Sequence, residues 1–265
     1  MPTPSVPSFS TQRARSYVLR LPLFTRAVIV AICVFWLLDL LPLWDLRKWG
    51  SWSPAEFGFK SLYRMNTFPF IHLNIFHAIF NILALTPLLE RFESEHGTLT
   101  SLAMFFGPLT TLPALLYIVL AKGLGGGTPV MGASMWVFLL LGVEAIRTYR
   151  TNPYLTIATY NIPTWTTPLA LAFCLLAFVP GSSFLGHISG LVVGYAFGLG
   201  YLKVLAPPEW GLRWVEGKLN LLGRLPHYVS VDQKTYGRFG VLPSTSPGPS
   251  GSPKIIVGGG QRLGP

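Results

Sequence analysis

Long apolar runs separated by short polar segments are the dominant pattern along this 265-residue chain. A helix needs about 20 predominantly apolar residues to cross a bilayer. Six runs approach or reach that length, and we interpret each of them as a membrane-spanning helix. The runs cover residues 23–44, 70–89, 99–121, 130–147, 167–180 and 184–205. The pattern therefore predicts an all-α membrane protein, with a bundle of six transmembrane helices over residues 22–205.

Segments at the two ends of the chain lack this pattern. Residues 1–21 are polar and basic and contain no small-residue cleavage site, so we expect a cytosolic N-terminus without a cleavable signal peptide. Residues 206–265 are rich in Pro, Gly and Ser, which predicts a disordered cytosolic tail. Within that tail, residues 209–225 are amphipathic, and they fit either a helix on the membrane surface or an irregular linker.

The composition supports the membrane class. Only 11% of the residues are charged and 51% are hydrophobic, whereas soluble domains carry about 25% charged residues. The net charge of +10 is explained by topology. With the N-terminus in the cytosol, fifteen of the 20 Lys and Arg residues fall on the cytosolic side, as the positive-inside rule requires. We therefore attribute the positive charge to membrane orientation and not to nucleic-acid binding.

Polar residues inside the apolar runs are candidates for function, because burying them in a bilayer costs free energy. Ser134 begins the fourth run and His187 begins the sixth, so the oriented topology places both near the outer face. Such a pair could act as nucleophile and general base. A serine bonded to its own backbone and a histidine used only for packing are the alternative interpretation. The full set of these residues is Asp39, His72, Asn74, His77, Asn81, Ser134, Glu144 and His187.

The second run adds polar groups at the same depth. His77 and Asn81 are four residues apart and share one helix face, and His72 precedes them. Side-chain donors at that level could stabilise an oxyanion together with the Ser134 backbone N–H. An interhelical polar clasp is the alternative.

Small residues indicate how these helices could approach each other. Gly190, Gly194 and Gly198 follow His187 at helical spacing and predict a close-packing face on the sixth helix. The fourth run supplies Gly132 and Gly142. We expect this packing to bring Ser134 within reach of His187.

These residues together resemble the rhomboid intramembrane serine proteases. Gly132-Ala-Ser134 is similar to the family's Gly-x-Ser motif, and His187 with Gly190 and Gly194 is similar to its sixth-helix histidine and glycines. Three further features also resemble the family: the His72, His77 and Asn81 pattern, Arg64 in the first outer loop, and Phe138 one turn after the serine. Two residues depart from it, since Met135 stands where Gly is usual and Tyr63 where Trp is usual.

The resemblance implies a Ser134–His187 dyad with oxyanion donors at His77 and Asn81, supported by His72. It also implies an outward-opening cavity and single-span membrane proteins as substrates, with no metal or cofactor required. Asp39 and Glu144 then have structural roles, near the outer end of the first helix and the inner end of the fourth.

A short motif near the C-terminus resembles the SHP box, which recruits an AAA ATPase of the valosin-containing-protein class. Residues 256–264 contain Gly258, Gly260 and Leu263 at the motif's spacing, with Ile256 in place of the usual Phe. A six-span core with such a tail is most similar to the fungal Golgi members of the family. This resemblance implies a Golgi membrane location and substrates that include membrane-bound transcription-factor precursors.

Two other functional classes fit parts of the sequence. A non-catalytic, derlin-type relative would also recruit the ATPase and would act in membrane-protein extraction, but that class lacks the Ser134–His187 pair. A small transporter or channel would need polar groups along the whole membrane thickness, whereas here they gather in the outer half.

Overall fold

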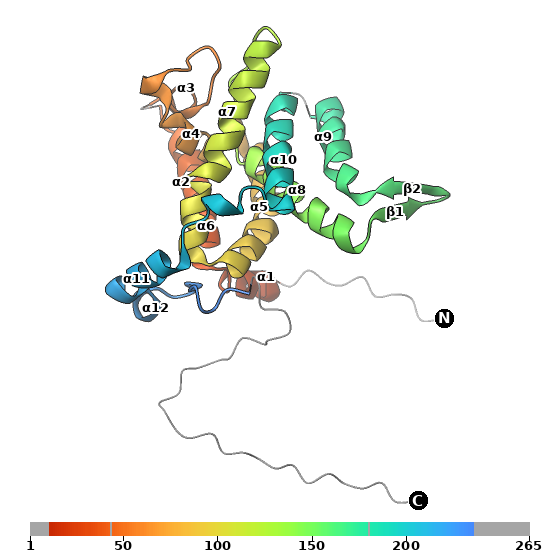
Figure 1. Cartoon of the computed structure of the whole chain (residues 1–265). Helices are drawn as coiled ribbons and strands as arrows, with labels where there is room; N and C mark the ends of the chain where they lie inside the picture. Colours follow the sequence, from red (N-terminus) through yellow and green to blue (C-terminus); the bar gives the residue numbers. More distant parts are fainter. Residues whose placement is uncertain (1–10, 43, 180, 236–265) are drawn as a thin grey trace, which may run out of the picture.

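Helices occupy most of the chain in the computed structural model, which describes residues 11–42, 44–179 and 181–235 (Figure 1). Helices form in all six predicted runs, and the third run is divided at Gly107 into α6 and α7. The helices of these runs are α2 (Leu23–Asp39), α5 (Ile75–His96), α6 (Thr98–Phe105), α7 (Pro108–Gly123), α8 (Ser134–Thr151), α9 (Thr167–Phe178) and α10 (Phe184–Leu199).

Two segments of the described residues are long and apolar enough to cross a membrane by themselves. They are Ile75–His96 and Thr98–Gly123, and a third is added if the bent pair Phe184–Leu199 and Lys203–Leu219 is counted as one span. The chain therefore has membrane-spanning helices by length and composition.

The second helix begins later than the apolar run predicts. Asn74 caps α5, because its side chain accepts a hydrogen bond from the backbone N–H of His77 at 2.8 Å. His72 consequently lies in the loop before the helix and not inside it, which corrects the sequence interpretation. His77 and Asn81 are in the first two turns of α5, as predicted.

Helix α8 lies at the centre of the bundle and is buried along most of its length. Glycines allow α10 to pack directly on its backbone: a Cβ at Gly190 would overlap the carbonyl oxygen of Met135, and a Cβ at Gly194 would overlap that of Leu139. Gly142 of α8 is equally close to α10, since a Cβ there would lie 2.9 Å from the carbonyl oxygen of Leu191. The predicted glycine-mediated packing of these two helices is confirmed.

The long connection between α2 and α5 folds over the end of the bundle that the predicted topology places outside. We name this the outer end, and the opposite end the inner end. Trp52 in this loop is fully buried, and its backbone exchanges two hydrogen bonds with Val130, at 2.9 and 2.8 Å. Its indole Nε1 donates to the carbonyl of Ala114 in α7 at 2.9 Å. The helical pieces of this connection are α3 (Leu46–Gly50), η1 (Phe59–Ser61), α4 (Arg64–Thr67) and η2 (Phe68–Phe70).

A buried carboxylate joins α2, α5 and α6 at the inner end. Glu93 is 0% exposed, and its Oε1 accepts from the Phe24 N–H at 2.8 Å and the Thr98 hydroxyl at 2.7 Å. Its Oε2 accepts from the N–H and the hydroxyl of Thr25, at 2.7 and 2.9 Å. The charge lies at the N-terminus of α2, where the helix dipole favours an anion.

Four charged side chains tie the inner ends of α5 and α8 together. Arg91 contacts Glu95 at 3.0 Å and Glu144 at 2.6 Å, and Arg147 contacts the same two carboxylates at 2.6 and 2.9 Å. Glu144 is therefore structural, as expected. Asp39 at the end of α2 likewise has a structural partner, because it pairs with Arg47 at 2.7 Å.

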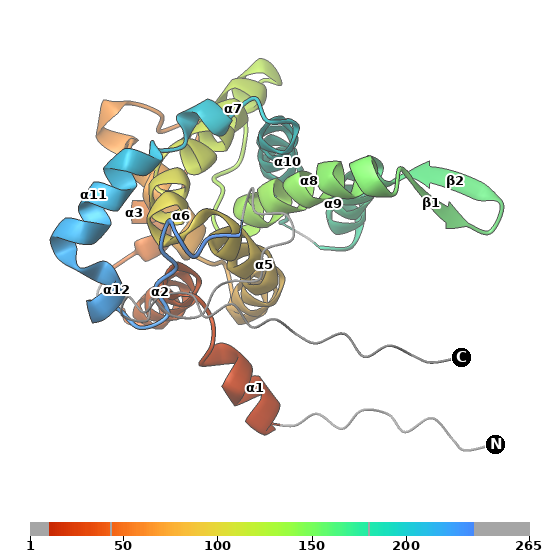
Figure 2. The ribbon, with the colours of Figure 1, turned by 60° about the horizontal axis from the view of Figure 1, so that its bottom comes forward.

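A β-hairpin projects from the molecule between α8 and α9, which the all-α prediction omitted (Figure 2). Strands β1 (Tyr154–Ile157) and β2 (Tyr160–Pro163) pair antiparallel, and Ala158 in the turn has a φ of 53°. The segment is too short for a hydrophobic period to distinguish it from a loop.

The sequence predicts a disordered tail from residue 206 onward. This prediction is wrong for residues 206–235, because they include helices. Residues 206–235 follow η4 (Lys203–Leu205) and include α11 (Glu209–Leu219) and α12 (Leu221–Arg224). The irregular segment after α12, residues 226–235, contains turns, and we name it the strap. Of the two alternatives for residues 209–225, the structure shows a helix and not an irregular linker, with a break at Asn220, whose φ is 48°. A short α1 (Thr11–Val18) and η3 (Thr164–Thr166) complete the described elements.

The strap docks on the inner ends of the helices. Thr98 N–H donates to the Val229 carbonyl at 2.8 Å, and the Val229 N–H donates to the Thr98 hydroxyl at 2.9 Å. The Leu23 N–H donates to the His227 carbonyl at 3.0 Å, and Val231 is only 2% exposed. The strap was not predicted because these contacts use backbone groups that leave no pattern in the sequence.

Candidate active site

Ser134 is the first residue of α8, as the sequence predicted. The preceding Gly132 has a φ of 102°, a conformation that side chains other than glycine rarely adopt. The first N–H groups of a helix have no partner within it, so this turn presents backbone donors beside the serine hydroxyl. A hydroxyl nucleophile and backbone donors are thus brought together by one turn of chain.

The turn is held from the loop that precedes α5. The Gly132 N–H donates to the Phe68 carbonyl at 2.8 Å, and the Ala133 N–H donates to Nε2 of His72 at 3.4 Å. Because Nε2 of His72 accepts, its Nδ1 carries the proton and donates to the Phe70 carbonyl at 3.1 Å. His72 therefore positions the serine turn and does not face the hydroxyl, and the contribution of Phe68 could not be predicted because a backbone carbonyl has no sequence signature.

His77 and Asn81 lie against the same turn. A Cβ added at Gly132 would be 2.6 Å from Cε1 and 2.9 Å from Nε2 of His77, and 3.5 Å from Nδ2 of Asn81. Only a glycine leaves room here. The amide of Asn81 uses one N–H to donate to the His77 carbonyl at 2.9 Å, which leaves its second N–H for another acceptor. The predicted oxyanion donors are therefore adjacent to the residue pair Gly132–Ala133 that precedes the serine.

His187 occupies the first turn of α10 with its ring stacked on Phe138 of α8. The ring centroids are 4.3 Å apart with an interplanar angle of 18°, so the predicted aromatic contact is present. The side chain is 4% exposed, and its Nδ1 is buried without a hydrogen-bond partner among the described residues. A buried polar atom without a partner costs free energy, which is a feature typical of functional sites.

The register between α8 and α10 determines whether Ser134 and His187 lie at the same level along the helix axes. The close glycine contacts pair position 135 with 190, 139 with 194 and 143 with 198, a constant offset that describes two parallel helices. Extended toward the outer end, this register places His187 level with the turn Gly132–Ser134. No hydrogen bond joins Ser134 to His187 within the described residues, so the structure brings the pair to one level but leaves the dyad bond unmade.

The two departures from the rhomboid pattern pack within the protein. The Met135 side chain is 2% exposed and packs in a cluster with Trp52, Phe68 and Tyr117, and its Cε approaches Gly186, the residue before His187. The hydroxyl of Tyr63 donates to the Trp49 carbonyl at 2.8 Å. Arg64 pairs with Glu56, so both residues fix the outer loop.

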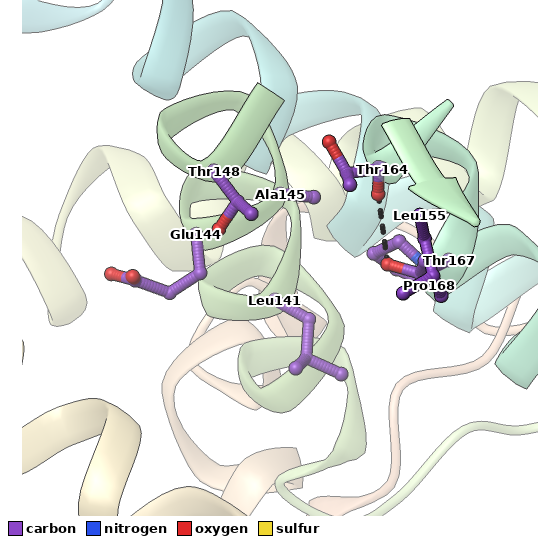
Figure 3. A pocket seen from close by; sticks show the side chains of 8 residues that line it. All are labelled: Leu141, Glu144, Ala145, Thr148, Leu155, Thr164, Thr167 and Pro168. Atoms are coloured by element: carbon purple, nitrogen blue, oxygen red, sulfur yellow. Dashed lines mark hydrogen bonds between the residues drawn. The ribbon is translucent and has the colours of Figure 1, made fainter. Parts of the chain in front are cut away.

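A pocket of about 290 Å³ lies elsewhere, between α8, β1 and the start of α9 (Figure 3). None of the predicted site residues lines it. Glu144 is its one ionisable lining residue, and Figure 3 shows that its carboxylate points away from the others. The carboxylate pairs with Arg91 and Arg147. Within the described residues, no group of His, Cys, Asp and Glu side chains could hold a metal ion.

Comparisons with known proteins identify the family that this chain resembles. The family model of the rhomboid domain matches residues 60–204, which include every predicted outer-end site residue from Arg64 to Gly194. Rhomboid-type serine protease 2 of Neurospora crassa is 66% identical over 97% of this chain and 95% of its own length. Rhomboid-type serine protease B of Aspergillus fumigatus is 59% identical over 97% of this chain and 96% of its own. Rhomboid-type serine protease 2 of Saccharomyces cerevisiae is 34% identical over 76% and 77%.

Proposed function

The chain belongs to the rhomboid family of serine proteases, and from this we propose that it cleaves single-span membrane proteins in or near the bilayer by a Ser134–His187 dyad. Six membrane crossings are part of the proposal: α2, α5, the α6–α7 pair, α8, α9 and α10, with both termini in the cytosol. The observation that carries the proposal is the convergence of three helices on the serine turn. Gly132 touches His77 and Asn81 from α5, and Phe138 holds the His187 ring from α10.

The chemistry follows from the groups present. The Ser134 hydroxyl attacks the substrate carbonyl, and the imidazole of His187 accepts the hydroxyl proton and then protonates the leaving amine. The carbonyl oxygen becomes an oxyanion near the N-terminus of α8, where the backbone N–H of Ser134 and side-chain N–H groups of Asn81 and His77 can donate to it. A water molecule then hydrolyses the acyl-enzyme, with His187 again as the base.

Cleavage of a co-expressed single-span membrane protein tests this proposal. We expect product with the wild-type chain and none with Ser134→Ala or His187→Ala. Asn81→Ala should lower the rate by an amount equivalent to about 2.7–4 kcal/mol, less if His77 compensates. Cleavage that continues undiminished with Ser134→Ala would contradict the nucleophile assignment. A chain that never cleaves but retains an ATPase partner would support the derlin-type alternative.

The SHP-like motif lies outside the described residues, so its role stays a prediction from the sequence. We propose that Ile256, Gly258, Gly260 and Leu263 recruit the AAA ATPase, and that the protein works in the Golgi membrane on substrates that include transcription-factor precursors. Co-purification of the ATPase should be lost with Leu263→Ala. Equal recovery with that variant would refute the motif.

A further inference from the structure

Helix α11 follows the last apolar helix almost at once and turns away from it. The segment Lys203–Leu219 makes an angle of 91° with α10. A helix perpendicular to a membrane-spanning helix, and joined to its inner end by a few residues, runs parallel to the membrane plane. Figures 1 and 2 place α11 and α12 at the edge of the bundle's inner end, while the strap passes below the bundle.

One side of α11 is occupied by the strap. Leu212 and Glu216 are buried, and the Glu216 carboxylate accepts from the Tyr228 hydroxyl at 2.7 Å and from the Val231 N–H at 2.9 Å. Burial of the Tyr228 phenol, together with its hydrogen bond to the Glu216 carboxylate, raises the pKa of Tyr228. The docked side of the helix is therefore fixed by a buried hydrogen-bonded contact.

The opposite side carries two tryptophans that no described part of the chain covers. Trp210 and Trp214 are 77% and 62% exposed, and their spacing of four residues puts them on one helix face. Lys218 lies on the same helix face, one turn after Trp214. Tryptophan is enriched where a membrane meets water, because its ring is apolar and its N–H is polar.

Positively charged side chains beside this face can attract an anionic lipid surface. Arg213 pairs with Glu209 and Asp232, and Lys234 pairs with Glu209. Lys218 and Arg224 have no ion-pair partner among the described residues, so their positive charges remain available. Basic residues of this kind bind the cytosolic leaflet, which carries anionic lipids.

We propose that α11 binds the anionic surface of the cytosolic leaflet through Trp210 and Trp214, with Lys218 and Arg224 contacting lipid headgroups. The surface-bound helix then holds the strap through Glu216. The strap in turn completes the N-terminus of α2, where His227 accepts from Leu23, and bonds to Thr98 beside Glu93. The membrane surface thereby stabilises the inner end of the bundle.

Site-directed spin labelling of the full chain in vesicles tests the proposal. Single cysteines replace Trp210, Trp214 or, as the matched control, the exposed strap residue Gln233, in a background where Cys33 and Cys174 are serine. The vesicles contain phosphatidylcholine alone or mixed with phosphatidylserine. We expect labels at 210 and 214 to be several-fold more accessible to dissolved oxygen, relative to an aqueous nickel reagent, than the label at 233. Phosphatidylserine should increase that contrast, and Lys218→Glu combined with Arg224→Glu should remove the increase.

Three results would count against the proposal. Labels at 210 and 214 that meet the nickel reagent as readily as the label at 233 would place this face in the cytosol. Dipolar broadening between labels on different molecules would instead assign the face to a second copy of the chain. A contrast that is the same in both lipid mixtures would contradict the role of Lys218 and Arg224 as headgroup contacts.

Discussion

The Glu93 carboxylate at the inner end and the His187 imidazole at the outer end differ in how their polar atoms are satisfied. At the inner end, each oxygen of the Glu93 carboxylate accepts two hydrogen bonds, and four further charges form a closed ion-pair network. At the outer end, Nδ1 of His187 has no partner and no hydrogen bond joins Ser134 to His187 among the described residues. Satisfied buried groups stabilise a fold, whereas unsatisfied ones remain available for a substrate. The comparison separates a group that stabilises the fold from the group that we propose takes part in the chemistry.

The largest expected effect separates activity from stability at the outer end. His187→Phe removes the general base but keeps a flat ring to stack on Phe138. We expect cleavage to fall at least about a thousandfold, because a nucleophile without its base is weak. The thermal midpoint should not decrease, since an unpartnered buried nitrogen is lost. A midpoint well below that of the wild type would show that His187 supports the fold.

Glu93→Ala should have the reverse effect at the inner end. It leaves the donors of Phe24, Thr25 and Thr98 without an acceptor, so we expect the unfolding free energy to fall by about 3 kcal/mol or more. Equilibrium unfolding in detergent micelles measures the loss. Glu93→Gln is the matched control, because its amide oxygen still accepts and the loss should be smaller. Equal losses for both variants would contradict the hydrogen-bond explanation.

Gly194→Ala tests the helix contact that connects the two ends. The added Cβ would overlap the Leu139 carbonyl, and overpacking of this kind costs about 1–3 kcal/mol. The added Cβ forces α8 and α10 apart, so we expect both the cleavage rate and the stability to fall. Gly217→Ala in α11 is the control: its Cβ meets nothing within 4 Å, so it should leave both unchanged or stabilise the helix slightly. Full activity in Gly194→Ala would show that the close packing is dispensable.

The smallest expected effect is a pH dependence of the strap. The pKa of Tyr228 is raised above its ordinary value of about 10 by burial and by Glu216. Its contribution to docking is therefore complete below about pH 10 and is lost as the pH rises further. A spin label at position 233 should become mobile above about pH 10, and Tyr228→Phe should shift or remove that transition. A transition that is identical in Tyr228→Phe would assign it to another group.

The sequence predicts the outer end better than the inner end, for a physical reason. Ser134, His187, His77 and Asn81 are polar residues in apolar runs, and such residues are conspicuous because few occur there. The inner end depends on contacts between distant segments: the four donors to Glu93 come from residues that look ordinary in the sequence. The strap and the β-hairpin were missed because backbone hydrogen bonds carry no residue signature.

The most direct test of the central claim is covalent labelling of the wild-type protein in its membrane with a serine-directed fluorophosphonate. The account predicts an adduct on Ser134, since this hydroxyl lies at the level of His187 and of the oxyanion donors His77 and Asn81. Labelling should disappear in Ser134→Ala and in His187→Phe, while both variants remain folded. Labelling that persists in Ser134→Ala, or a folded wild-type protein that does not react, would contradict the assignment of the outer end as the active site.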